Sequence, residues 1–310
     1  MKKFLLKVAL FFILVAVLDM ICGWGFDILR SKARGGQTRK NEYIANECMD
    51  DILILGSSKA DHHYVPSVFE DSLGLTCYNA GEMGCGIIPA YIRYQMVSNR
   101  KKPRLVLYEV TPTYDYLETD SYTHYLGAMR QYADRKDVRK VYLDFSDDLE
   151  RLRLLSNMYC NNSKVLMNLK DVFAKPDIWK GYEPLNGKIN PNKVSKNVAD
   201  EIITDKPIDS LKYAYFENLI IEANRDEIPL VFVISPSLHG NKKDVDYRPA
   251  FEMGHKYNIP IIDNRNCESF VGQSDYYQDG THLNHVGAVA YSQYVVDQIN
   301  ELMNKRTIMQ

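Results

Sequence analysis

Five short apolar runs, separated by longer segments with helical spacing, organise the chain after residue 50. The runs lie at 51–56, 75–81, 104–110, 229–236 and 259–263. Continuous apolar runs of this length suit strands that are buried on both faces of a parallel sheet. Segments of helical length lie at 87–99, 210–225, 244–257 and 284–304. This alternation predicts a three-layer α/β/α, flavodoxin-like fold with a five-stranded parallel sheet.

The first thirty residues follow a different pattern. Three lysines in the first seven positions precede an apolar run from Val8 to Gly25, which only Asp19 interrupts. About 20 apolar residues span a bilayer core. No small-x-small cleavage site follows the run, so we favour an uncleaved signal anchor at 1–28 over a cleaved signal peptide. A buried soluble helix fits less well, because the run has no polar face.

Basic residues flank both ends of the apolar run, so the positive-inside rule is nearly balanced. A short N-terminal tail usually stays in the cytoplasm. We therefore expect the main domain outside the cytoplasm, in the periplasm or at the cell surface, with the N-terminal helix as its contact with the membrane.

Two further segments complete the predicted organisation. The polar residues 29–48 are interpreted as a linker, and 49–310 as one α/β domain. Residues 117–207 break the alternation and are interpreted as a helical insertion after the third strand. Loops at the carboxyl ends of parallel strands border the ligand crevice, so we expect the insertion to shape substrate access. The tyrosines around its start, at 114, 116, 122, 125 and 132, suit either stacking on sugars or a mixed core and surface of the insertion.

Composition excludes some functions. A formal net charge of −2 gives no reason to expect a nucleic-acid partner. Six cysteines include no Cys-x-x-Cys pair, which argues against a zinc ribbon; Cys77 and Cys85 suit either a disulfide or buried free thiols. His62 and His63 follow Asp61, but no second ligand cluster appears. We predict neither a metal nor a cofactor.

Candidate chemistry begins where the first apolar run stops, at Gly56-Ser57-Ser58. A serine at the turn between a strand and a helix presents its hydroxyl at the crevice and its N–H at a helix N-terminus. Helix capping is the plainer interpretation of either serine. Asp279 and His282 lie three residues apart before the last helix, where a carboxylate can orient an imidazole that accepts the serine proton. His285, one helical turn further on, is not assigned to this site.

The third signal is the segment from Asn79 to Gly86, with glycines at 81, 84 and 86. Such a loop lets backbone N–H groups approach a developing oxyanion. It is not a phosphate loop, because no Gly-Lys-Ser/Thr sequence follows, and its spacing does not fit a dinucleotide-binding motif.

Together these three blocks, in this order, resemble those of SGNH/GDSL-type hydrolases, and in particular a membrane-anchored subset with Gly-Ser-Ser in place of Gly-Asp-Ser. The resemblance covers roughly residues 51–128 and 210–300. It implies Ser58 as the nucleophile, His282 as the base and Asp279 as the orienting acid. It also implies that the N–H groups of Ser58 and Gly81 bind the oxyanion.

One block departs from the family pattern. The family usually has Gly-x-Asn-Asp after the third strand, with the Asn completing the oxyanion hole, whereas this chain reads Val110 to Tyr116 without an Asn. Thr111 and Asp115 occupy that region, and with Asn79 and His62 they are the candidate substrate-binding residues. The resemblance implies a membrane-anchored esterase or acyltransferase whose partners are an acylated glycan or an acyl donor. A non-catalytic scaffold of the same fold is the alternative.

Overall fold

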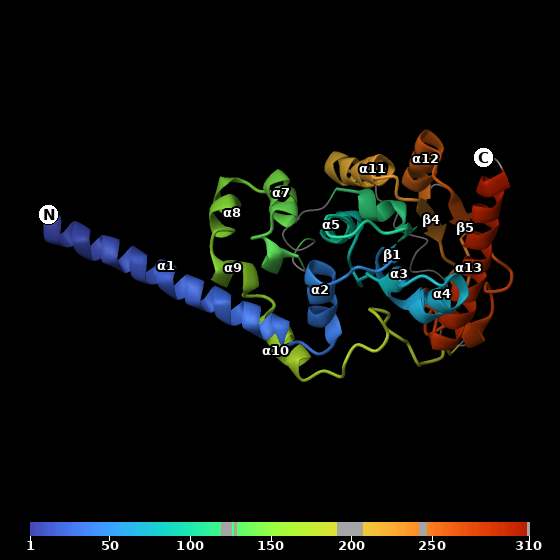
Figure 1. Cartoon of the computed structure of the whole chain (residues 1–310), viewed down its shortest axis with the longest axis horizontal. Helices are drawn as coiled ribbons and strands as arrows, with labels where there is room; N and C mark the ends of the chain where they lie inside the picture. The colour runs from blue at the N-terminus through green and yellow to red at the C-terminus, as the bar shows by residue number, and fades with distance from the viewer. Residues whose placement is uncertain (119–125, 127–128, 191–206, 242–246, 309–310) are drawn as a thin grey trace. The chain divides into compact units, whose positions relative to one another are not determined.

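The computed structural model describes residues 1–118, 126, 129–190, 207–241 and 247–308 (Figure 1). The chain divides into two compact units. Unit 1 combines Met1–Glu47 with Ser121–Asp177, and unit 2 combines Cys48–Asp120 with Ile178–Gln310. Each unit is described by itself.

Unit 2 contains the five-stranded sheet that the apolar runs predict. Its strands are β1 (Ile52–Leu55), β2 (Cys77–Asn79), β3 (Leu105–Glu109), β4 (Leu230–Ile234) and β5 (Ile261–Asp263). They pair in the order β2-β1-β3-β4-β5, and every pairing is parallel. The register places Ile54 beside both Asn79 and Leu107. The carboxyl ends of β1, β2 and β3 therefore lie side by side, which confirms the predicted fold class.

Helices cover both faces of the sheet (Figure 1). One face carries α3 (Ser58–His63), α4 (Pro66–Leu73) and α13 (His285–Ile308); the other carries α5 (Ile87–Ser98), α11 (Ser210–Arg225) and α12 (Arg248–Tyr257). The predicted helices thus appear close to their expected positions, although 244–246 lie outside the described residues. Short 3₁₀ turns occupy Thr113–Tyr116 and Ser274–Tyr276.

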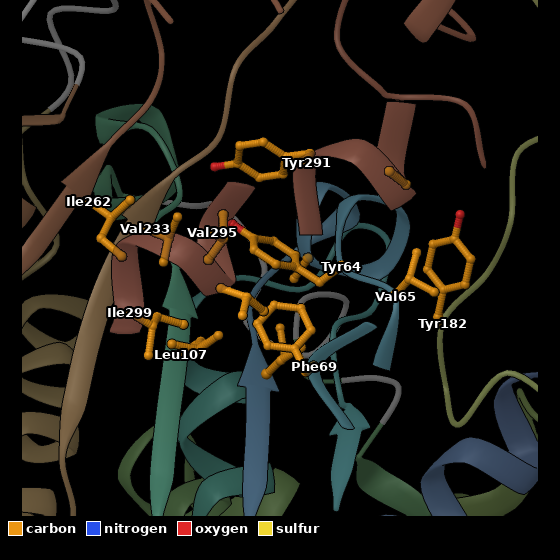
Figure 2. Close-up of a cluster of buried hydrophobic side chains, with 14 of the residues drawn as sticks. Tyr64, Val65, Phe69, Leu107, Tyr182, Val233, Ile262, Tyr291, Val295 and Ile299 are labelled. Carbon is orange, nitrogen blue, oxygen red and sulfur yellow. The ribbon is translucent and has the colours of Figure 1, made fainter. Parts of the chain in front are cut away.

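The core under α13 explains why the first strand can be apolar throughout. Ile54 and Leu107 of the sheet are fully buried against Phe69 of α4, and Val295 and Ile299 of α13 (Figure 2). On the opposite face of the sheet, aromatic rings of β3, β4 and α11 pack together, with centroids 5.2–6.0 Å apart. Because both faces are covered, the short strands are apolar along most of their length, and the polar Asn79 and Glu109 fall at carboxyl ends.

Unit 1 is helical. It contains α1 (Lys2–Ser31), α2 (Gly36–Asn46), a 3₁₀ turn at Arg130–Tyr132, α7 (Lys136–Asp144), α8 (Asp148–Arg153), α9 (Asn157–Asn161) and α10 (Val165–Val172). By length and composition, α1 is the one helix among the described residues that can cross a membrane.

Two predicted segment boundaries are wrong. Residues 29–48 were expected to be a linker, but most of them form the end of α1 and the helix α2, whose polar residues Thr38 and Asn41 are buried. The expected insertion at 117–207 is not a single piece: Ser121–Asp177 belongs to unit 1, whereas the described residues after Ile178 pack in unit 2. The polar composition of 29–48 misled the prediction because unit 1 buries polar side chains in hydrogen-bonded pairs.

Candidate active site

Gly56 makes the turn that presents Ser58. Its φ is +140°, and a Cβ there would lie 2.8 Å from the Glu109 carbonyl oxygen and 2.9 Å from the Ala60 Cβ. Only glycine fits this conformation and this close approach. Helix α3 then begins at Ser58, and the Ser57 side chain makes no capping hydrogen bond. The strand therefore ends in a sharp turn that leaves the Ser58 side chain partly exposed.

Ser58, His282 and Asp279 form a connected chain of hydrogen bonds. The Ser58 Oγ lies 2.8 Å from the His282 Nε2, and the His282 Nδ1 lies 2.9 Å from the Asp279 Oδ2. The three residues predicted to meet thus do meet, although 224 positions separate Ser58 from His282. The Asp279 Oδ1 also accepts hydrogen bonds from the backbone N–H groups of Thr281 and His282, at 2.7 and 2.8 Å.

These contacts fix the charge of Asp279 and the tautomer of His282. Burial pushes the pKa of Asp279 up, but its hydrogen bonds to the His282 ring and to two backbone N–H groups outweigh burial and lower the pKa to about 2. The carboxylate can only accept, so the Nδ1 of His282 carries the proton and the Nε2 is left to accept from Ser58.

One backbone donor is ready for an oxyanion. Within the part of the chain that the structure describes, no acceptor takes the N–H of Ser58, which is the first residue of α3. The N–H of Gly81 instead donates to the Asn79 Oδ1 at 3.0 Å. The expected oxyanion role of Gly81 therefore requires that this hydrogen bond be broken first.

The Asn79 side chain is used within the protein, and its predicted contact with substrate stays a prediction. Its side chain is fully buried, and its Nδ2 donates to the carbonyl oxygens of Ala60 and Tyr64, at 2.7 and 2.9 Å. With the bond to Gly81, both ends of the amide are satisfied. Asn79 ties the end of β2 to α3. Gly81 allows the contact, because a Cβ there would lie 2.5 Å from the Asp61 nitrogen.

Thr111 and Asp115 also have partners within the protein. The Thr111 Oγ1 donates to the Asp115 Oδ2 at 3.1 Å, and the same oxygen accepts from the Ile87 N–H at 3.3 Å, where α5 begins. Their contact with substrate stays a prediction. The two residues hold the start of α5 against the end of β3, which positions the glycine loop before it.

His62 lies beside the base. Its ring is buried with its centroid 5.6 Å from that of His282, and its Nδ1 donates to the Glu183 carbonyl oxygen at 2.7 Å. Glu183 comes from the segment 178–190, which also contacts His285: the Tyr182 hydroxyl lies 3.0 Å from the His285 Nδ1. His62 thus lies next to the base, and its contact with substrate stays a prediction. His285 stands outside the triad.

A second chain of hydrogen bonds, which the sequence did not reveal, runs behind the triad. The His63 Nε2 accepts from the backbone N–H of Leu283 at 3.0 Å, and its Nδ1 lies 3.0 Å from the Ser235 Oγ. Ser235 donates through its hydroxyl and its N–H to the Glu109 Oε1, at 2.6 and 3.1 Å. Tyr64 donates to the other oxygen of Glu109. We call His63, Ser235, Glu109 and Tyr64 the buried relay.

Burial sets the charges of the buried relay. Burial lowers the pKa of His63 well below its usual range, helped by the positive charge of Lys59, so His63 stays neutral and can accept from Leu283. Burial raises the pKa of Glu109, and the Lys59 charge and the hydrogen bonds from Ser235 and Tyr64 oppose that rise. The Lys59 Nζ itself donates to the carbonyl oxygens of Ser235 and Pro236, at 3.0 and 3.3 Å.

Comparison with known proteins gives structural matches only. No family model matches the sequence, and no curated protein matches it. One solved structure that it resembles is an acetyl xylan esterase, with 13% identity over 81% of this chain and 98% of that chain and a TM-score of 0.37. A GDSL-like lipase from Bacteroides thetaiotaomicron has 9% identity over 86% of this chain and 98% of that chain, with a TM-score of 0.38. An acetylxylan esterase from Geobacillus stearothermophilus has 11% identity over 81% of this chain and 94% of that chain, with a TM-score of 0.39. At these values, the chemistry of this chain has to be inferred from its own residues.

Among the described residues, the cysteines and tyrosines that the sequence singled out form no hydrogen bond with the triad. All six cysteines are free thiols, so Cys77 and Cys85 do not form a disulfide. Tyr116 and Tyr132 are buried, Tyr122 and Tyr125 lie outside the described residues, and the side chain of Tyr114 is not described.

A pocket of about 490 Å³ at the end of β5 is lined by Asp263, Cys267 and Tyr294 among others, and includes none of the triad.

Proposed function

We propose that this chain is a serine-dependent O-acyl esterase or acyltransferase of the SGNH type. The observation that carries the proposal is the uninterrupted chain from the Ser58 Oγ through both nitrogens of His282 to the Asp279 carboxylate. The chain joins a nucleophile, a base and an orienting acid in the order that acyl transfer needs.

The proposed reaction uses these groups in turn. His282 takes the Ser58 proton at its Nε2 while the Oγ bonds to the ester carbonyl carbon, and the Ser58 N–H faces the developing oxyanion. The imidazolium, stabilised by Asp279, then gives its proton to the departing alcohol, and an acyl-serine remains. Water or a sugar hydroxyl then gives its proton to His282 and attacks the acyl-serine. As the bond between the acyl carbon and the Ser58 Oγ breaks, His282 returns the proton to that Oγ, and the acid or the new ester leaves.

We further propose that α1 holds the enzyme at a membrane and that its substrate is an envelope or extracellular O-acylated glycan, with acetyl as the acyl group. The end of α1 supports retention over cleavage of this segment. Arg30 is buried in unit 1, where it donates to Glu42 at 3.1 Å and to Asn161 at 2.7 Å. Cleavage after α1 would leave these buried groups without their partner. The glycan rests on the resemblance of the sequence blocks alone.

Labelling with a fluorophosphonate tests the catalytic proposal. The full chain, purified in detergent, should react covalently, and Ser58→Ala should abolish the reaction. Ser57→Ala is the matched control, because the neighbouring hydroxyl makes no capping bond and should be dispensable. Unchanged labelling of Ser58→Ala, or a wild-type chain that does not react at all, would contradict the proposal.

Acyl transfer is separated from hydrolysis by the fate of the acyl group. We expect slow hydrolysis of p-nitrophenyl acetate alone, because of the two expected donors only the Ser58 N–H is available to bind the oxyanion, whereas acyl transfer usually uses two or more such donors. An oligosaccharide acceptor should speed release of p-nitrophenol and become acetylated, as mass spectrometry would show. Fast hydrolysis without an acetylated sugar would leave a plain esterase.

One observation favours the rival, a non-catalytic scaffold of the same fold. The Gly81 N–H is engaged by Asn79, and no Asn stands in the third block. A chain that merely retained the fold would need neither donor. The same labelling experiment decides, because a scaffold has no activated serine to react.

A further inference from the structure

Helix α10 in unit 1 has its polarity reversed. Asn168 and Asp171 are buried, while Leu166 is 82% exposed and Phe173, directly after the helix, is 80% exposed. The buried pair is hydrogen-bonded to α2: the Thr38 Oγ1 donates to Asn168 at 3.0 Å, and the Thr38 N–H donates to Asp171 at 2.9 Å. Helices that face water show the opposite arrangement, with apolar residues inside.

The apolar exterior continues over the two helices before α10. Exposed side chains on and between α8, α9 and α10 include Leu149, Leu152, Leu155, Met158, Leu166, Leu169 and Phe173; we call these seven the apolar face. Helix α7 of the same unit is ordinary, because Val138 and Val141 are buried and Lys136 and Lys140 are exposed. Large apolar side chains exposed on successive helices indicate a surface that another apolar medium covers.

Part of the apolar face adjoins α1, the candidate membrane helix. Of the helices that carry the face, α9 and α10 pack against the second half of α1 (Figure 1). The Asp19 carboxylate accepts from the Ser156 Oγ at 2.6 Å and from the N–H groups of Asn157 and Met158, at 2.8 and 3.0 Å. The only charged side chain within the apolar run of α1 is thus satisfied by the segment that carries the apolar face.

The length of α1 places this contact near one boundary of a bilayer. Residues 4–18 are exposed on all sides, which suits lipid. A helix rises about 1.5 Å per residue, so Asp19 lies about 24 Å along α1 from Lys3, short of the ~30 Å thickness of a hydrocarbon core. Trp24, which is 69% exposed, follows five residues later and so lies near the membrane interface, where tryptophans are enriched.

We propose that the apolar face inserts into the leaflet opposite to Lys2 and Lys3, so that unit 1 is a membrane-embedded module and α1 is not its only contact with lipid. Arg151, Arg153 and Lys170 are exposed on the same helices, where their charged ends can reach phospholipid headgroups. The inference rests on the proposed anchoring by α1, and not on the catalytic role of Ser58.

Site-directed fluorescence in vesicles tests this. The full chain, with Cys22→Ser and Cys267→Ser to remove the two partly exposed thiols, is given single cysteines by Leu166→Cys or Phe173→Cys, or by Lys140→Cys on α7 as the matched control. Each is labelled with the environment-sensitive dye NBD and reconstituted in vesicles of phosphatidylcholine and phosphatidylglycerol. Doxyl-labelled lipid should quench the first two dyes at least twofold more than the control, and aqueous iodide should quench only the control.

The other outcomes overturn the proposal. Iodide quenching at all three positions would place the apolar face in water, and protection from both quenchers would mean that protein, such as a second copy, covers it. Failure of the wild-type chain to float with vesicles would refute the anchoring itself. A second experiment needs no thiol substitutions: the wild-type chain is crosslinked with a diazirine phospholipid. Peptides from 148–173 should carry lipid, and those from α7 should not.

Discussion

His63 accepts a hydrogen bond from the backbone N–H of Leu283, with 3.0 Å between its Nε2 and the Leu283 nitrogen. Leu283 directly follows His282, so the buried relay holds the backbone that carries the base. Glu109 at the end of β3 and Ser235 at the end of β4 hold His63 in turn. The position of His282 relative to Ser58 therefore depends on two strands that contribute no side chain to the triad.

The first prediction concerns His63 as a positioning residue. His63→Ala leaves the Leu283 N–H buried without an acceptor, and we expect kcat to fall by about 10- to 100-fold through misplacement of His282. KM should change little, and the rate of fluorophosphonate labelling should fall with kcat. His63→Gln, whose amide oxygen can accept from Leu283, should recover part of the loss.

His239→Ala is the control for that variant, because His239 is exposed on the loop after β4. It should leave kcat unchanged. An effect of His63→Ala on KM alone, or on stability with normal kcat in the folded fraction, would show that the buried relay does not position the base.

The triad should respond as a unit. Ser58→Ala and His282→Ala should each remove most turnover of an ester substrate, and the double variant should be little worse than either one. The measurement is kcat/KM for the three variants in the same detergent. Losses that add as independent free energies would argue against a shared mechanism.

Asp279→Asn tests the tautomer. The amide oxygen can still accept from the Thr281 and His282 N–H groups, so the turn should keep its shape. Its nitrogen cannot accept the His282 Nδ1 proton, and we expect a loss of up to roughly 10⁴ in kcat. An Asp279→Asn chain with near-normal kcat would remove Asp279 from the mechanism.

The pH dependence of stability follows from the same carboxylate. The pKa of Asp279 is about 2 in the folded chain, against an ordinary value of 3.8. A lowered acid pKa stabilises the folded state above the ordinary value, and this stabilisation is lost as the pH falls through the folded value. The Tm difference between wild type and Asp279→Asn in detergent should be constant above about pH 5 and shrink between about pH 4 and 2. A difference independent of pH across that window would contradict the assignment.

Gly56→Ala should damage both stability and activity. The strained φ of +140° and the contact with the Glu109 carbonyl oxygen act together, and backbone strain of this kind costs of order 1–3 kcal/mol. Gly74→Ala is the control, since its φ is +66° and its Cβ would meet nothing within 4 Å. Denaturant unfolding should show a clearly larger loss at position 56. Equal losses at both positions would mean that the close approach at Gly56 carries no cost.

The sequence alone determined the elements that local pattern controls. Apolar runs predicted all five strands, because strands buried on both faces are apolar along most of their length. Asp279 and His282 could be paired from the sequence, because three residues in one turn suffice to bring them together. The turn at Gly56 could be predicted for the same reason, since the glycine is required by a local backbone conformation.

Only the tertiary structure decided which groups meet across the fold. The 2.8 Å contact between Ser58 and His282 depends on α13 packing beside α3. The sequence could not show that the Asn79 side-chain amide donates to the Ala60 carbonyl oxygen in α3 and accepts from the Gly81 N–H. Glu109, Ser235 and His63 lie far apart along the chain, so no spacing could join them. The residues at 29–48 resembled a linker because they are polar, but in unit 1 the polar side chains of Thr38 and Asn168 are buried and hydrogen-bonded to each other.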